Sequence, residues 1–336
     1  MSSIPVHLGL DYHQSVVQVC VMDAAGQILA NRDCPNQWEA IARLGARHGQ
    51  VAGAALEACT GAASLADELV GRAGMPVQLA HPGFVSRMKH NPDKTDWGDA
   101  RLLADLHRVG YLPQVWLAPP EVRELRRLVR YRQQLVHECR NRRLRITALL
   151  RDQRVGPGPG RRWTLRWLHW LRQEASLTRH GRWVIERHLK WIDLLTREIL
   201  LVERQLSRLT AKDPIVQQLL NQPGIGPVTA WVMRAEIGRF DRFRSGKQLA
   251  RFCGLSPCNA SSGLRQSDAG LIRAGNRYLR ATLIEAAHRL RRYQPRWKAL
   301  GDALEARGKP ASVVAAAIAN RWMRWLYHQM VSQPAA

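Results

Sequence analysis

Apolar residues in the first third of the chain form short runs that alternate with helically spaced stretches. Three apolar or β-branched runs come first and are joined by tight turns, as in an antiparallel meander. Helical and strand-like segments then alternate. The predicted strands are 6–10, 16–22, 27–34, 51–56 and 77–81, and the predicted helices are 37–48, 62–72 and 96–109. This pattern predicts a mixed α/β domain over residues 1–118.

Prolines at positions 113, 119 and 120 end that alternation, and apolar positions beyond them recur every three or four residues. One seam runs through positions 125, 128, 132, 135, 139, 142, 146 and 149, and another through 192, 195, 199, 202, 206 and 209. Such heptads predict two long coiled-coil helices that pack on each other or on another copy. Arg132 and Arg142 interrupt the first seam and disfavour a dry, symmetric core there.

The remaining sequence is mainly helical. Helical patterns cover 228–237, 277–292 and 311–330, and a segment rich in Gly, Ser and Asn lies over 254–276. We therefore expect a helical middle region at 119–212, with Arg-rich and Trp-rich segments, and a helical C-terminal domain at 213–336.

The net charge of the chain indicates the class of molecule that it binds. The chain has 51 Lys and Arg against 27 Asp and Glu, a formal net charge of +24. Such a balance favours nucleic acid, because neutralising phosphates releases counterions. The Arg residues are spread over most of the chain, which makes a membrane surface the weaker interpretation. The six scattered cysteines form no metal-binding pair, and neither a signal peptide nor a membrane span is predicted, so we expect a cytoplasmic protein.

Four acids are placed like metal ligands on this basic background. Asp11 and Glu57 each end a predicted strand, and Asp96 and Asp99 share one face of a helix's first turn. Together with the order of elements, which is that of the ribonuclease-H-like fold, they predict a site for Mg²⁺, with Mn²⁺ as the other candidate. Taken singly, Asp11 is also explained as a turn acid, and Asp96 as an acid that complements the helix dipole behind a Thr95 cap.

Three segments that carry these acids resemble the DEDD-type insertion-sequence transposases, which are guided by a bridge RNA and have a RuvC-like N-terminal domain. The segments are Gly9-Leu10-Asp11, Leu56-Glu57-Ala58-Cys59-Thr60-Gly61 and Lys94-Thr95-Asp96-Trp97-Gly98-Asp99-Ala100. The resemblance implies that the four acids are the metal-binding tetrad. It also implies donor and target DNA, a structured guide RNA and a homo-oligomer, either dimer or tetramer, as partners. The sequence departs from the family at Gln14, where a Lys is frequent, and near Ala62–Ala63, where an aromatic is frequent.

The Gly- and Ser-rich segment contains a second candidate centre. By composition alone, Ser261-Ser262-Gly263 is an ordinary loop. The resemblance implies that Ser262 is the nucleophile, with Ser261 as the fallback, and that a 5′-phosphoserine link to DNA forms. Nearby polar residues are candidates for binding the nucleic acid or neutralising charge on phosphorus: Arg265, Arg273, Asn276, Arg277 and Arg280.

Two further features suggest nucleic-acid contacts. Gly224 and Gly226 lie in a turn of helix-hairpin-helix type, where backbone N–H groups can approach a phosphate; a tight helix connection explains them equally well. Arg126 and Arg130 lie on the Arg-rich first heptad helix, which we expect to present Arg to an RNA or DNA backbone. The alternative is that this run of charge is only a solvated face. The sequence thus favours an RNA-guided DNA recombinase. The alternatives are a metal-dependent, structure-selective DNA nuclease of the Holliday-junction resolvase type and a non-enzymatic nucleic-acid scaffold.

Overall fold

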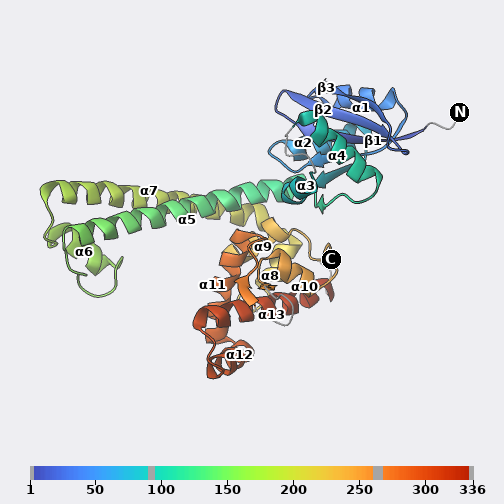
Figure 1. Cartoon of the computed structure of the whole chain (residues 1–336). Coiled ribbons are helices and arrows are strands. Elements are labelled where there is room, and N and C mark those ends of the chain that lie inside the picture. Colours follow the sequence, from blue (N-terminus) through green and yellow to red (C-terminus); the bar gives the residue numbers. More distant parts are fainter. Residues whose placement is uncertain (1–3, 90–94, 260–267, 333–336) are drawn as a thin grey trace. The chain divides into compact units, whose positions relative to one another are not determined.

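The computed structural model describes residues 4–89, 95–259 and 268–332 (Figure 1). The chain divides into two compact units, Met1–Ala118 and Pro119–Ala336. The first unit is built on a sheet, and the second is mainly helical. None of the helices in the described ranges is long and apolar enough to cross a membrane.

The first unit contains a six-stranded sheet with the order β3-β2-β1-β4-β5-β6. Its strands are β1 (Pro5–Tyr12), β2 (Val16–Asp23), β3 (Ile28–Pro35), β4 (Gln50–Glu57), β5 (Val77–Ala80) and β6 (Gln114–Val115). The first three strands pair antiparallel, whereas β4 is parallel to β1 and β5 is parallel to β4. This is the strand order expected of a ribonuclease-H-like sheet. It brings the carboxyl ends of β1 and β4 to the same edge.

Helices cover both faces of this sheet. They are α1 (Trp38–Ala46), α2 (Ala62–Ala73), α3 (Pro82–Met88) and α4 (Asp96–Arg108). Ile41 of α1 and Leu65 of α2 share one core with Leu8 of β1, whereas Ala100 of α4 packs with Cys20 and other residues of the opposite face. The predicted strands and helices are confirmed. The pattern missed the short elements α3 and β6.

The second unit begins with a hairpin of two long helices. These are α5 (Pro120–Asp152) and α7 (Arg179–Thr210), and the connection between them contains the short helix α6 (Leu165–Gln173) (Figure 1). Arg132 of α5 donates from Nε to Glu203 at 2.8 Å, and the Arg142 guanidinium lies over the Trp191 ring, so the helices run antiparallel. The two arginines that interrupt the apolar seam are thereby accommodated by a carboxylate and an aromatic face on α7. Leu209, predicted to lie in the second seam, is half exposed.

The base of the hairpin is part of the C-terminal core. The helices there are α8 (Pro214–Leu220), α9 (Pro227–Ile237), α10 (Gly246–Phe252), α11 (Arg277–Tyr293), α12 (Pro295–Ala306) and α13 (Ala311–Ser332), and two short strands, β7 (Pro257–Asn259) and β8 (Asp268–Leu271), pair antiparallel. Leu125 and Val129 of α5 and Leu206 of α7 are buried in one cluster with Trp231 and Trp322. The far end of the hairpin has a core of its own, which includes the fully buried Trp167.

Candidate active site

Asp11 lies near the end of β1 and on the face of the sheet that α4 covers. Side chains alternate along a strand, and Leu8 and Leu10 belong to the core on the opposite face. Gly9 therefore faces α4, and the Asp11 side chain lies on that same face of the sheet. A Cβ at Gly9 would overlap the Ala100 carbonyl oxygen and the Ala104 backbone nitrogen. The absence of a side chain at Gly9 thus allows α4 to lie directly against β1.

The first turn of α4 is held in place by two hydrogen bonds. Thr95 caps the helix, and its hydroxyl accepts from the Gly98 N–H at 3.2 Å. Asn31 of β3 donates to the Trp97 carbonyl oxygen at 3.0 Å. These contacts and the close packing at Gly9 bring Asp96, at the first helical position, to the end of β1.

Asp11 and Asp96 meet around a histidine that follows β1. The Nε2 atom of His13 lies 3.5 Å from an Asp11 carboxylate oxygen and 3.1 Å from one of Asp96. One ligand atom from each of the three residues falls within 4.8 Å of the others. His13 was not among the predicted ligands. In the sequence, only its position two residues after an acid at a strand end could have indicated that it joins the site.

Glu57 and Asp99 border this cluster in different ways. Leu56 of β4 pairs with Leu10 of β1, so Glu57 and Asp11 follow at neighbouring strand ends. Both carboxylates contribute to raising the pKa of the Cys59 thiol, although burial is the larger cause. The Asp99 side chain is nearly buried and forms an ion pair with Lys89 Nζ at 2.6 Å. The cluster proper thus contains two of the four predicted acids, with Glu57 alongside and Asp99 paired to a lysine.

The predicted serine centre falls between two described strands. Ser261, Ser262 and Arg265 lie outside the described residues. On either side, β7 and β8 pair with each other. A Cβ on Gly275 would overlap the backbone of Gly254, so the two ends of the glycine-rich segment touch each other.

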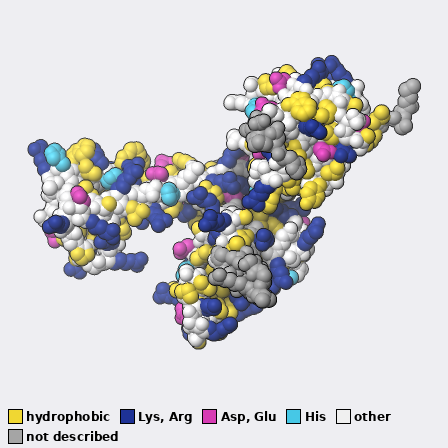
Figure 2. All heavy atoms as spheres, viewed as in Figure 1, with side chains coloured by type: hydrophobic (Ala, Val, Ile, Leu, Met, Phe, Trp, Pro, Cys, Tyr) yellow, Lys and Arg dark blue, Asp and Glu magenta, His cyan; other side chains and the backbone are white. Residues whose placement is uncertain are grey.

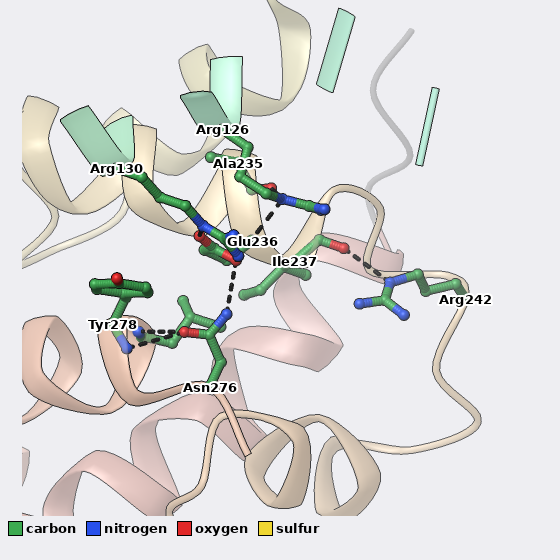
Figure 3. A network of polar contacts seen from close by, with 9 residues as sticks. Arg126, Arg130, Ala235, Glu236, Ile237, Arg242, Asn276 and Tyr278 are labelled. Atoms are coloured by element: carbon green, nitrogen blue, oxygen red, sulfur yellow. Dashed lines mark hydrogen bonds and ion pairs between the residues drawn. The ribbon is translucent and has the colours of Figure 1, made fainter. Parts of the chain in front are cut away.

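Three predicted nucleic-acid residues form part of one partly buried network (Figure 3). Arg126, Arg130 and Asn276 surround Glu236 of α9, and Asn276 also caps α11. The network therefore gives each of them a packing role inside the second unit, whatever else they bind.

The other predicted contacts differ in exposure. Arg273, which precedes α11, and Arg277, the first residue of that helix, are both exposed, whereas Arg280 donates to the Ile272 carbonyl oxygen at 2.8 Å. Gly224 has a φ of 83° and packs so closely on Leu290 that a side chain would not fit. By contrast, no described atom lies within 4 Å of the Cβ position at Gly226, the N-cap residue of α9. Packing thus explains Gly224, and Gly226 has the space that a phosphate contact needs.

Comparison with known proteins identifies the family. A transposase family model for DEDD proteins of IS110 elements matches residues 8–154, and the model "Transposase IS116/IS110/IS902 family" matches residues 216–302. A Pseudomonas aeruginosa protein with the name "Probable family 20 transposase" is 30% identical in an alignment that covers 95% of this chain and 95% of that protein. The chain belongs to the IS110 family of transposases.

Other relatives of this transposase agree with the assignment. The transposase for insertion sequence element IS1111A of Coxiella burnetii is 26% identical over 95% of this chain and 88% of its own length. The y4qE protein of Sinorhizobium fredii is 30% identical over 71% of this chain, and the match spans 65% of that protein, just under two-thirds. As a member of a transposase family, the chain is an enzyme that acts on DNA.

The DEDD class of the transposase implies a divalent metal, and the residues of its first unit fit one. Two carboxylates and an imidazole direct ligand atoms to within 4.8 Å of one another; a small closure of these side chains would let one divalent cation bind all three, since Mg²⁺ takes its ligands at about 2.1 Å. Asp11 and Asp96 would hold the ion, Glu57 lies beside them, and the Asp99 carboxylate would join after leaving Lys89. A cation at this position would relieve the mutual repulsion of the acids.

Proposed function

We propose that this IS110-family transposase cuts and rejoins DNA by transesterification through Ser262, with Ser261 as the fallback nucleophile and the four-acid site as the holder of Mg²⁺. The observation that carries the proposal is the convergence of Asp11 and Asp96, far apart in sequence, at the end of β1. The basic composition and the Ser-Gly segment in the same chain support it.

The proposed step conserves the energy of the phosphodiester. The serine Oγ forms a bond to phosphorus while the bond from phosphorus to the 3′ oxygen breaks, and the hydroxyl proton ends on that 3′ oxygen. The product is a 5′-phosphoserine link and a free 3′-OH. Attack by another 3′-OH reverses the exchange and joins new partners. A bound divalent cation supplies charge stabilisation for the phosphoryl oxygens.

A covalent adduct tests the proposed nucleophile. We expect the wild-type transposase, loaded with DNA and its co-purifying RNA, to form a protein–DNA adduct that survives denaturation. The adduct should disappear in the double variant Ser262→Ala/Ser261→Ala, because no hydroxyl remains at that position to attack phosphorus. Ser256→Ala, in the described residues before the same segment, is the matched control and should retain it. An adduct that persists in the double variant would reject the serine.

The second candidate function is a metal-dependent, structure-selective DNA nuclease. The acidic cluster on a ribonuclease-H-like sheet favours it, because such a site can act on a phosphodiester with water as the nucleophile. Hydrolysed DNA ends without any adduct, formed equally well by the double serine variant, would decide for this candidate.

We also propose that a structured RNA guides the transposase. Lys and Arg side chains are spread over the visible faces of both units (Figure 2), as a protein that holds RNA and DNA together requires. If the guide selects the DNA sites by base pairing, the side chains of the protein do not need to read the DNA sequence. Sequencing the RNA that co-purifies with the protein tests this. Recovery of random cellular RNA with no enriched species would oppose it.

The hairpin supports assembly into a coiled-coil dimer or tetramer. Along α7, four apolar side chains that fall on one side of the helix are at least 47% exposed: Trp183, Trp191, Leu194 and Leu201. We propose that a second copy covers this stripe, because an exposed apolar face of this length favours association. Light scattering of Leu194→Glu/Leu201→Glu should show a smaller particle than the wild type, and an unchanged mass would oppose the proposal.

A further inference from the structure

Asp99, one of the four acids, already has a cation against it. Its carboxylate oxygen Oδ1 lies 2.6 Å from the Nζ atom of Lys89. The side chain of Lys89 is 23% exposed and that of Asp99 is 12% exposed, so water and salt screen this ion pair less than a surface pair. Removal of one partner would leave the other charge largely buried and uncompensated.

The position of Asp99 on α4 relates it to the acidic cluster. Asp96 and Asp99 are three residues apart in the first turn of α4, and side chains at this spacing lie on the same face of a helix. Asp96 supplies a ligand atom to the group that Asp11 and His13 complete, whereas Asp99 is not part of that group among the described residues. Lys89 thus pairs with the acid that stands next to the cluster without joining it.

The backbone that carries Lys89 is anchored on the helix that carries Asp99. Lys89 directly follows α3, and Val85 of α3 is buried in one core with Leu103 and Leu106 of α4. The packing of α3 on α4 therefore brings the lysine to the first turn of α4. The ion pair is a consequence of the fold and not of a long side chain that lies across a free surface.

An ammonium group and a metal ion compete for one carboxylate. If Asp99 held both at once, the two positive charges would lie close together at a poorly screened position, which costs Coulomb energy. A divalent cation that takes Asp99 as a ligand must therefore displace Lys89. The free energy of the ion pair is then lost from the free energy of metal binding, which is a negative coupling between the two cations.

We propose that Lys89 is an internal competitor for the metal ion of the four-acid site. It holds Asp99 in the metal-free protein, and it is expelled when the cation completes its ligands. Lys89 is a positioning residue, because it acts through Asp99 and does not itself bind the metal. The inference rests on the proposed function, from which it takes the four acids as the holders of the ion. The alternative is an ion pair that only stabilises the fold.

Calorimetric titration of the full-length protein with Mn²⁺ tests the proposal. Lys89→Met keeps the length of the side chain and removes the ammonium group. We expect this variant to bind Mn²⁺ about 5- to 150-fold more tightly than the wild type, the usual range for a coupling between two ligands, because no lysine has to be displaced. Lys89→Arg retains a cation beside Asp99 and should bind Mn²⁺ with close to the wild-type affinity.

Thermal unfolding separates competition from a structural role. Without metal, Lys89→Met should melt at a lower temperature than the wild type, because Asp99 has lost its counter-ion. Saturating Mn²⁺ should raise the melting temperature of Lys89→Met by more than that of the wild type, since a tighter ligand stabilises the folded state more. An ion pair that only stabilises the fold predicts a lower melting temperature together with Mn²⁺ binding that is unchanged or weaker.

Lys298→Met is the matched control for both measurements. Lys298 also pairs with an aspartate, Asp302 of α12, at 3.2 Å, but both side chains are exposed and lie in the second unit. Exposed pairs contribute little to stability. Loss of this lysine should therefore leave the Mn²⁺ affinity and the melting temperatures at wild-type values.

Acetylation of the wild-type protein gives a measurement that needs no variant. An N-hydroxysuccinimide ester of acetic acid modifies lysine amines, and mass spectrometry follows the rate at each site. The rate at Lys89 should rise when Mn²⁺ saturates the protein, because the displaced amine becomes accessible, whereas the rate at Lys298 should not change. Equal rates at Lys89 with and without Mn²⁺, or a folded Lys89→Met that binds Mn²⁺ no more tightly than the wild type, would overturn the proposal.

Failure of this inference and failure of the proposed function are distinguishable. If the wild type binds Mn²⁺ and Asp11→Asn does not, but Lys89→Met binds no more tightly, the metal site stands and only the role of Lys89 is rejected. If neither the wild type nor Lys89→Met binds Mn²⁺, the four-acid site is rejected together with the inference. The adduct experiment decides on the serine nucleophile in either case.

Discussion

Asp11→Asn should abolish DNA cleavage and leave the fold intact. Asparagine keeps the shape of the side chain and removes one charged oxygen ligand from the group that Asp11, His13 and Asp96 form. Loss of metal stabilisation is worth several kcal/mol, and about 4 kcal/mol corresponds to a rate about 10³-fold lower. The fold should persist because the substitution relieves repulsion between neighbouring carboxylates. The measurements are strand cleavage and calorimetric binding of Mn²⁺, which we expect to weaken together.

Asp105→Asn is the matched control for this experiment. Asp105 lies on the same helix, α4, but its carboxylate pairs with Arg108. Its loss should leave both cation binding and cleavage near wild-type values. Wild-type cleavage in Asp11→Asn, or equal losses in the two variants, would remove Asp11 from the catalytic site.

Gly9→Ala should unfold or strongly destabilise the first unit and eliminate its cation binding. The added Cβ would overlap the backbone of Ala100 and Ala104, which cannot move aside as the end of a flexible side chain can. Overpacking costs about 1–3 kcal/mol, and we expect this case to reach about 3 kcal/mol or more, because Ala100 and Ala104, which face Gly9, are fully buried. Displacement of α4 would also carry Asp96 away from Asp11. Urea unfolding and Mn²⁺ calorimetry measure the two effects.

Gly71→Ala is the opposite case and serves as the control. Gly71 lies within α2, and no described atom would come within 4 Å of a Cβ there. Alanine is the better helix former, so this variant should be more stable by about 0.5–1 kcal/mol. If Gly9→Ala were as stable as wild type and still bound Mn²⁺, close packing of α4 on β1 would not be what assembles the site.

Local sequence patterns predicted much of the fold. The short apolar runs and helical spacings of the first 110 residues correspond to the strands and helices observed, because central strands such as β2 are buried on both faces and each helix buries one. Even the two arginines that break the heptad seam were visible, although their partners, Glu203 and Trp191, were not. Elements such as α3 and β6 were missed because they are too short to show a period in the sequence.

The candidate site was predictable in part. Asp11 and Asp96 lie at a strand end and a helix start, where chemistry of this kind is expected, and they meet. His13 and Lys89 were missed because neither position has a periodic or motif signal, and each is defined only by what folds against it. Glu236 offered a weak signal, a single acid on the mostly apolar helix α9, whose burial required a partner from elsewhere.

The sequence by itself determined the secondary structure, the basic character and the acids available for a metal, because these depend on composition and on spacing within single elements. Only the tertiary structure decided which acids meet, that a histidine joins them, and that Arg126, Arg130 and Asn276 surround the buried carboxylate of Glu236. Such contacts join residues from distant elements. Their distances depend on how closely backbones pack, as Gly9 allows against α4, and no local pattern along the chain records that.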